Sequence, residues 1–199
     1  LIFIALCWGL NFVIEKNVLL TMSPFMYLGV RFFLSALIIA IIFQKRLKRM
    51  NTEDIKACLI VGAFMLLGFL TQTVGLVYTT PSKSGFITGS NVVMVPFFAY
   101  ILTKKFPGTG QILGAIITFC GLGIISISDN LNIALGDILT LVCAISFALQ
   151  ITFTEFYVKK ADPINMAIIQ VTLTGIVTMG MAITREPLKY DLGVGNWAA

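Results

Sequence analysis

The chain has 199 residues, of which 58% are hydrophobic and only 12% are charged, and its mean hydropathy is +0.96. This composition excludes a water-soluble fold, because such a fold has no way to hide so much apolar surface. The net charge of +5 does not indicate nucleic-acid binding, since the basic residues form short clusters between apolar runs. We therefore expect an all-α integral membrane protein.

The residue types that usually carry catalysis and metal binding are scarce. The sequence has no histidine, which removes the commonest general base and metal ligand. Its four cysteines stand alone inside apolar segments, without the spacing of metal-binding or redox pairs, at Cys7, Cys58, Cys120 and Cys143. We predict no catalytic residues, no metal, no cofactor and no enzymatic activity.

Seven apolar runs are long enough to cross a bilayer as α-helices, since a hydrocarbon core of about 30 Å requires roughly 20 residues. In chain order we expect membrane-spanning helices at residues 1–20, 24–44, 57–78, 83–103, 110–127, 135–158 and 163–184. The connections contain polar residues, proline or glycine and are short, so neighbouring spans should be antiparallel. Pro96 is expected to kink the fourth span.

Lysine and arginine residues gather in the second, fourth and sixth connections. They are Lys45, Arg46, Lys48, Arg49 and Lys56, then Lys104 and Lys105, then Lys159 and Lys160. These connections share one face of the membrane when seven spans alternate in direction, and basic loops favour the cytoplasmic side. The sequence therefore predicts a multi-pass protein of the cell membrane, interpreted as the bacterial cytoplasmic membrane, with a cytoplasmic N-terminus.

The sequence repeats a pattern of residues at an offset of 139 positions. Trp8, Asn11, Pro24 and Arg31 recur as Phe147, Gln150, Pro163 and Gln170. Because the offset contains five expected spans, an odd number, the second copy enters the membrane in the opposite sense. Such inverted repeats are typical of secondary transporters. We predict a helical bundle built on inverted five-helix repeats, the first at residues 1–127 and the start of the second at 128–199.

The second repeat is incomplete within this sequence, which contains two of its five expected spans. Residues 196–199 resemble the beginning of an eighth span. The sequence is therefore interpreted as part of a longer protein with ten spans in total, of which about seven are present.

Two charged residues are expected inside the membrane, where a charge costs roughly 2.5 to 3.5 kcal/mol on insertion scales. Arg31 lies seven residues after Pro24, which places it roughly 10 Å into the second span at about 1.5 Å per residue. Glu15 precedes Pro24 by nine residues on the antiparallel first span, at a similar depth. We predict an ion pair across this hairpin, with either a functional or a purely structural role.

Polar residues on facing helices indicate a substrate site near the middle of the membrane. Trp8, Asn11 and Glu15 share one face of the first span, and Gln150 occupies the matching face of the sixth. In inverted repeats these faces meet at the bilayer midplane. The candidate substrate-binding residues are Trp8, Asn11, Glu15, Arg31, Gln72, Thr88, Asn91, Gln150 and Gln170. The alternative is hydrogen bonding between helices without substrate contact, worth about 0.6 to 2 kcal/mol.

A row of small residues marks the fifth span. Gly110, Gly114, Thr118 and Gly121 fall on one face of the expected helix, four, four and three residues apart. This spacing predicts close helix packing, either within one subunit or between the subunits of a homodimer.

The order of several short motifs resembles one known family. The run ALCWGLNF at residues 5–12, Pro24 and the run RFF at 31–33 are similar to the first two spans of the EamA family, in the drug/metabolite transporter (DMT) superfamily. Its third to fifth spans resemble the runs GLVYTT at 75–80 and KSGFIT at 83–88, then Pro96, Gln111, Gly114 and Gly121. The resemblance implies ten helices in two inverted halves and the movement of small metabolites, often outward.

These observations predict a secondary transporter that exports small metabolites, such as amino acids or related amphipathic compounds, by alternating access around a midplane site. Its expected partners are a small-molecule substrate and the lipid bilayer, with no nucleic acid. Glu15 is the candidate for proton coupling, and no nucleotide-binding loop is found in the sequence. The alternatives are an exchanger of phosphorylated or nucleotide sugars, an intramembrane lipid-modifying enzyme and a non-transporting assembly partner.

Overall fold

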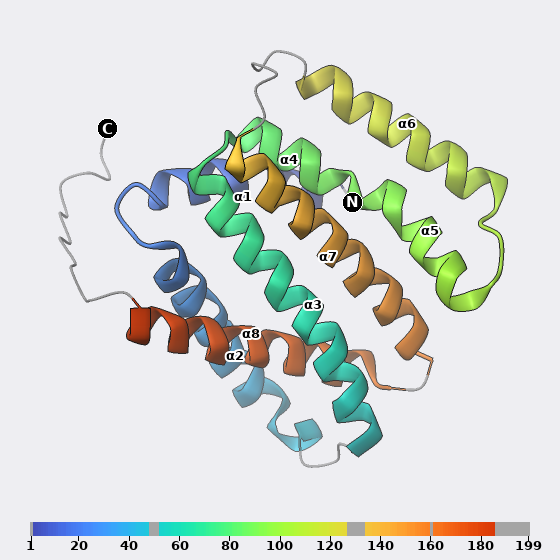
Figure 1. Ribbon diagram of the computed structural model, residues 1–199. Coiled ribbons are helices and arrows are strands. Elements are labelled where there is room, and N and C mark those ends of the chain that lie inside the picture. Colours follow the sequence, from blue (N-terminus) through green and yellow to red (C-terminus); the bar gives the residue numbers. More distant parts are fainter. Residues whose placement is uncertain (1, 48–51, 127–133, 160, 186–199) are drawn as a thin grey trace.

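The computed structural model describes residues 2–47, 52–126, 134–159 and 161–185. The regular elements in these ranges are all α-helices (Figure 1). In chain order they are α1 (Ile2–Val18), α2 (Pro24–Leu47), α3 (Thr52–Val77), α4 (Pro81–Gly89), α5 (Asn91–Thr103), α6 (Thr109–Ser126), α7 (Leu135–Tyr157) and α8 (Pro163–Arg185). The all-α, multi-span fold class is confirmed, whereas residues 196–199, the expected start of an eighth span, lie outside the described residues.

Five described segments are long and apolar enough to cross a membrane. They are Pro24–Gln44, Ile55–Val77, Pro81–Thr103, Leu135–Tyr157 and Pro163–Arg185. Helix α1, with 17 residues, and the apolar segment Thr109–Gly121 of α6 are shorter. The seven expected spans therefore all contain helix, and five of them have the full length that a bilayer requires.

The fourth expected span is divided into two helices, because α4 ends at Gly89 and α5 begins at Asn91. At Ser90, between them, the hydroxyl donates a hydrogen bond to the carbonyl of Ile87 at 2.6 Å. A serine hydroxyl that bonds a carbonyl of the preceding turn competes with the helical backbone and bends a helix. The interruption therefore lies at Ser90, whereas α5 continues through Pro96, where the sequence placed the kink.

The helices that follow the repeated proline begin in the same way. Pro24 and Pro163 are the first residues of α2 and α8, a position where the missing N–H of proline costs no hydrogen bond. Asp162 accepts hydrogen bonds from the backbone N–H groups of Ile164 and Asn165 at 2.8 and 3.4 Å. Such capping satisfies N–H groups that have no partner within the helix. The repeated proline thus fixes where two helices start.

Helices α3 and α7 run side by side through the middle of the bundle, and α4 and α5 pack on α7 (Figure 1). The backbones of α3 and α7 come closest where Gly75 meets Gly136. A Cβ atom added to Gly136 would collide with the carbonyl oxygen of Gly75 and with the backbone of Thr79. A side chain at position 136 is therefore excluded by steric contact, in keeping with the small residues that let membrane helices approach closely.

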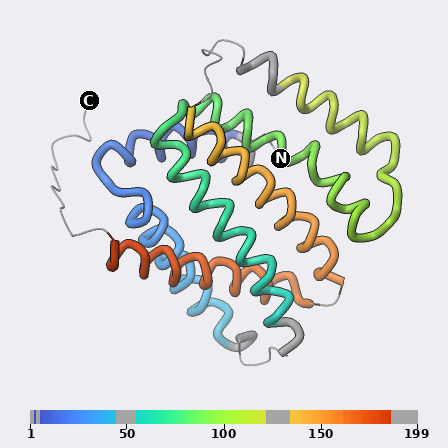
Figure 2. The backbone as a smooth tube through the Cα atoms, in the orientation of Figure 1, coloured from blue at the N-terminus to red at the C-terminus, as the bar shows by residue number. Residues whose placement is uncertain are grey.

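Helix α8 crosses α2 and also packs on α3 (Figure 2). A Cβ atom added to Gly175 of α8 would lie 2.8 Å from the backbone of Phe32 in α2, and one added to Gly29 would lie 3.0 Å from the backbone of Met179. Because Gly29 precedes Phe32 whereas Met179 follows Gly175, the two helices run in opposite directions. Inverted copies of one span would pair in this way, and the division into repeats at 1–127 and 128–199 stays a prediction.

Helix α6 lies at the edge of the bundle beside α5 (Figure 2). A Cβ atom added to Gly110, Gly114 or Gly121 would meet no atom of the described residues within 4 Å. The close packing predicted by these small residues is thus absent within the described part of the chain, because the space beside them is open. Packing between the subunits of a homodimer stays a prediction.

Candidate functional site

A buried carboxylate forms the centre of the candidate site. The side chain of Glu15, on α1, is 1% exposed. Its Oε1 accepts a hydrogen bond from the Thr73 hydroxyl of α3 at 2.5 Å, and its Oε2 accepts one from the Asn11 side-chain amide at 3.0 Å. A carboxylate held away from water requires such partners, because an unpaired buried charge is costly. Glu15 thereby ties α1 to α3.

The guanidinium of Arg31, on α2, lies beside the same carboxylate. Its Nη1 is 3.8 Å from Glu15 Oε2 and donates a hydrogen bond to the Tyr27 hydroxyl at 3.4 Å. The ring centres of Tyr27, Phe32 and Phe69 lie 5.9, 5.5 and 5.7 Å from the guanidinium carbon, within the range of cation–π attraction. The Arg31 side chain is 36% exposed. The ion pair predicted across the first hairpin is therefore present.

A second row of polar contacts begins next to Thr73. The Gln72 side-chain amide donates a hydrogen bond to the Thr88 hydroxyl of α4 at 3.3 Å, and that hydroxyl lies 4.0 Å from the Cys143 sulfur of α7. These three side chains are buried. We define the Glu15 cluster as Asn11, Glu15, Arg31, Gln72, Thr73 and Thr88. The cluster joins four helices, α1 to α4, and reaches the surface of α7.

The other candidate residues lie outside the Glu15 cluster. Gln150 of α7 donates a hydrogen bond to the side-chain oxygen of Gln170 on α8 at 2.8 Å, and Gln170 is 6% exposed. Asn91, the first residue of α5, lines a cavity between α5, α6 and α7. Trp8 is 72% exposed on α1. The structure thus brings five of the nine candidates into one cluster and two into an amide pair, and their contact with substrate stays a prediction.

Sequence reasoning missed the role of Lys16. Its ammonium group donates hydrogen bonds to the carbonyls of Leu76, Val77 and Thr79 at 2.6, 3.0 and 2.9 Å. The last carbonyls of a helix have no partner within it, so a cation at that end is favourable. No local pattern signals this contact, because Lys16 reaches the end of a helix some 60 residues away in the chain.

The start of α7 carries a further polar group. Asp137 accepts hydrogen bonds from the backbone N–H of Ala134 at 2.9 Å and from the Thr79 hydroxyl, and its Oδ2 lies 3.7 Å from the Lys83 ammonium. Asp137 lies in the first turn of α7, where an acidic side chain is favourable, so the sequence could have indicated a polar group at this helix start. Together with the Lys16 contacts, this group joins α1, α3, α4 and α7 at one end of the bundle.

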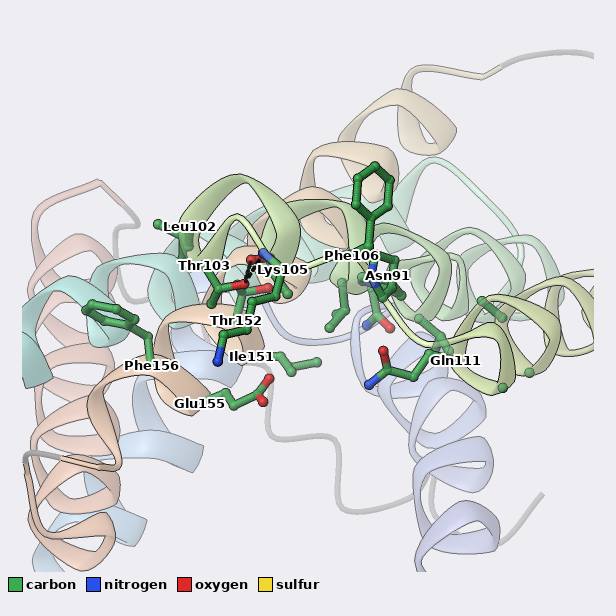
Figure 3. A pocket seen from close by; sticks show the side chains of 18 of the residues that line it. Asn91, Leu102, Thr103, Lys105, Phe106, Gln111, Ile151, Thr152, Glu155 and Phe156 are labelled. Atoms are coloured by element: carbon green, nitrogen blue, oxygen red, sulfur yellow. Dashed lines mark hydrogen bonds between the residues drawn. The ribbon is translucent and has the colours of Figure 1, made fainter.

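A cavity of about 780 Å³ lies between α5, α6 and α7 (Figure 3). Of the nine candidate residues, Asn91 lines it. Sequence reasoning did not find this cavity, because the spacing of the small residues on α6 predicted a helix contact where the structure leaves open space. Within the described residues, no three cysteine or acidic side chains form a group suited to holding a metal ion.

The fold is that of a multi-span membrane protein with a charged pair inside its helix bundle. In membrane proteins such charged residues mark substrate or ion pathways. The model of the EamA-like transporter family matches residues 1–127. This chain belongs to the EamA-like transporter family, as the resemblance of its motifs indicated.

Curated relatives carry matching names. The chain is 34% identical to an "Uncharacterized transporter" of Archaeoglobus fulgidus, over 82% of this chain and 50% of the relative. It is 23% identical to "Uncharacterized transporter YvbV" of Bacillus subtilis, over 88% of this chain and 59% of the relative. It is 24% identical to "Uncharacterized transporter YyaM" of the same organism, over 96% and 67%. The chain thus spans half to two thirds of the length of these relatives. No solved structure matches it.

Proposed function

We propose that the whole protein is a secondary transporter that moves small metabolites, such as amino acids or related amphipathic compounds, out of the cell by alternating access. The family and the names of the relatives support transport in general. The substrate class and the mechanism are inferred from the site, and the outward direction is what the resemblance to the family implies. The observation that carries the inference is the pairing of a buried Glu15 with a partly exposed Arg31.

The geometry of the pair suits ligand binding. The 3.8 Å between Arg31 Nη1 and Glu15 Oε2 exceeds the distance of about 2.7–2.9 Å that a charge-assisted hydrogen bond prefers. A guanidinium carries N–H donors on Nε and Nη2 as well, in a planar fork that matches a carboxylate. The carboxylate of an amino acid would therefore compete with Glu15 for Arg31.

This competition offers a route to alternating access. Glu15 is held to α3 by Thr73, so a substrate that draws Arg31 away from Glu15 would loosen α2 from α1 and α3. Helix α2 packs along α8, which belongs to the predicted second repeat. The movement would therefore pass from the first repeat to the second, as a rocking mechanism requires.

An exchanger of phosphorylated or nucleotide sugars is less well supported. Such a substrate requires cationic side chains that are available to phosphate groups. Around the Glu15 cluster, Arg31 and Lys83 each lie beside a carboxylate, that of Glu15 and that of Asp137. A neutral or zwitterionic substrate disturbs these pairs less than a multiply charged anion.

Export by the full-length protein tests the proposal. Proteoliposomes loaded with a mixture of labelled amino acids should release a subset of them faster than protein-free vesicles. Arg31→Lys keeps the charge but loses the fork, so we expect the apparent affinity for the released compound to fall by about tenfold. Arg185→Lys, at the exposed end of α8, is the matched control and should leave release unchanged. Release that is unaffected by Arg31→Lys would remove the binding role.

Proton coupling is tested separately with Glu15→Gln. The amide keeps the size of the side chain and one of its two hydrogen-bond acceptors, but it does not gain or lose charge with pH. We expect the wild-type protein to respond to an imposed pH gradient and the variant to lose that response while still binding substrate. An equal response of both proteins to the gradient would contradict the coupling role of Glu15.

A further inference from the structure

The cavity between α5, α6 and α7 is separate from the Glu15 cluster, none of whose residues lines it. Its volume of about 780 Å³ falls within the range of roughly 300–1,000 Å³ that small-molecule sites occupy. Its walls come from α5 and α6, from the connection between them, and from the second half of α7 (Figure 3).

The walls of the cavity are largely apolar. Val92 and Val95 of α5, Ile151 of α7 and Phe106 of the connection contribute hydrocarbon surface. On the opposite side, α6 presents glycines, including Gly114, and a Cβ atom added there would meet nothing within 4 Å among the described residues. The glycines on this face of α6 leave room for a hydrocarbon group beside the side chains of Gln111 and Thr118, which also line the cavity.

One part of the cavity is charged. Lys105, Glu155 and Lys159 line it, and within the described part of the chain none of the three forms an ion pair. Figure 3 shows the side chains of Lys105 and Glu155 extending into the same region of the cavity. Two ammonium groups and one carboxylate therefore border an apolar space, with their hydrogen-bonding capacity available to a ligand.

We propose that this cavity binds a zwitterionic amphiphile. The acidic group of the ligand would lie against the ammonium groups of Lys105 and Lys159, and its own ammonium group against the Glu155 carboxylate, both as charge-assisted hydrogen bonds. The apolar part would lie between α5 and α6, against Val95 and Gly114. A simple anion would leave the Glu155 carboxylate without a partner, and a simple cation would meet repulsion from both lysines.

Two sources supply this ligand chemistry. One is a free amino acid with an apolar side chain, and the other is the headgroup of phosphatidylethanolamine, whose phosphate and ammonium groups have the same arrangement of charges. Basic pockets between membrane helices bind lipid headgroups in other proteins. The proposal concerns binding alone, so it does not depend on the proposed transport activity.

Binding to the purified full-length protein separates the two sources. The probes are labelled leucine and dihexanoyl phosphatidylethanolamine, with dihexanoyl phosphatidylcholine and phosphatidylglycerol as lipids that lack the N–H donors or the ammonium group. We expect saturable binding of leucine or of phosphatidylethanolamine, at least about tenfold tighter than the other two lipids. Equal binding of phosphatidylglycerol, or binding of neither leucine nor phosphatidylethanolamine, would overturn the proposal.

Variants place the binding in this cavity. Glu155→Gln and Lys105→Gln should each weaken binding of the preferred probe by about tenfold, whereas Lys104→Gln, next to Lys105 but not part of the lining, should not. Gly114→Leu should abolish binding by filling the space, and Gly121→Leu is its matched control, since both positions are open and Gly121 lies outside the lining. Binding that survives Gly114→Leu, or that falls equally in Gly121→Leu, would show that the ligand sits elsewhere.

Discussion

The hairpin of α1 and α2 and the hairpin of α7 and α8 hold different chemistry at matching positions. In the first, Glu15 and Arg31 form an ion pair that Asn11 supports. In the second, Gln150 and Gln170, which match Asn11 and Arg31 at the offset of 139 residues, bond directly to each other at 2.8 Å. At these matching positions, one hairpin is therefore charged and the other is neutral.

The difference between the ion pair and the amide pair indicates which of the two can respond to a proton or to a charged ligand. A buried amide pair satisfies its own hydrogen bonds and is indifferent to protons or to the charge of a ligand. A buried ion pair is costly to keep and very costly to break, because removal of one partner strands the other. The ion pair of the first hairpin can thus respond to a proton or to a charged substrate, whereas the amide pair of the second cannot.

The largest expected effect comes from removing one charge of the first hairpin. Arg31→Leu leaves the Glu15 carboxylate buried with Thr73 and Asn11 as its remaining partners. We expect a loss of about 3 kcal/mol in the free energy of unfolding, at the lower end for a broken buried pair because Arg31 is 36% exposed. Unfolding of the purified protein in detergent by increasing denaturant measures it. A loss below about 1 kcal/mol would show that Glu15 does not depend on Arg31.

Converting the first hairpin to the chemistry of the second sharpens the comparison. The double variant Glu15→Thr with Arg31→Gln introduces the residues found at the matching positions 154 and 170. Because no charge is stranded, we expect it to recover about 2 kcal/mol relative to Arg31→Leu and to lose the response to a pH gradient. If the double variant were as unstable as Arg31→Leu, the loss in the free energy of unfolding would come from altered packing and not from an unpaired charge.

The neutral hairpin should be less sensitive. Gln170→Leu removes one partner of the amide pair, and we expect a loss of about 1 kcal/mol, the size of hydrogen bonds between membrane helices. A double-mutant cycle with Gln150→Leu isolates the pair, and the coupling energy should be similar. A coupling energy between Gln150 and Gln170 as large as the loss expected for Arg31→Leu would show that the two hairpins do not differ in this respect.

The smallest expected effect is at Trp8. Its side chain is 72% exposed and lies outside the Glu15 cluster, so Trp8→Leu should change the free energy of unfolding by less than about 0.5 kcal/mol. Release of labelled amino acids from proteoliposomes tests its other predicted role. If Trp8→Leu slowed the release of amino acids without changing the free energy of unfolding, Trp8 would have a role in substrate binding.

The sequence predicted those features that depend on short stretches of chain. The helix starts at Pro24 and Pro163 follow from local turn chemistry. The pairing of Glu15 with Arg31 follows from counting residues on either side of a tight turn, because two antiparallel helices place equal distances from the turn at equal depth.

Other features depend on which helices meet, and no local pattern reports that. The bond from Thr73 to Glu15 and the contacts of Lys16 join residues about 60 positions apart. The cavity at Gly114 arises because α6 leaves its small residues unpacked, whereas their spacing predicted a helix contact. The interruption at Ser90 was missed because a proline nearby gave a stronger signal than a serine hydroxyl.

Glu15 and Lys16 are consecutive, so their side chains leave α1 about 100° apart around its axis. Glu15 accepts a hydrogen bond from Thr73, and Lys16 donates to the carbonyls of Leu76 and Val77 at the end of α3 and of Thr79 just beyond it. Because these hydrogen bonds leave α1 in different directions and meet α3 at different points along its length, they oppose both rotation of α1 about its axis and translation of α1 along α3. Helices α1 and α3 should therefore move together as one rigid unit.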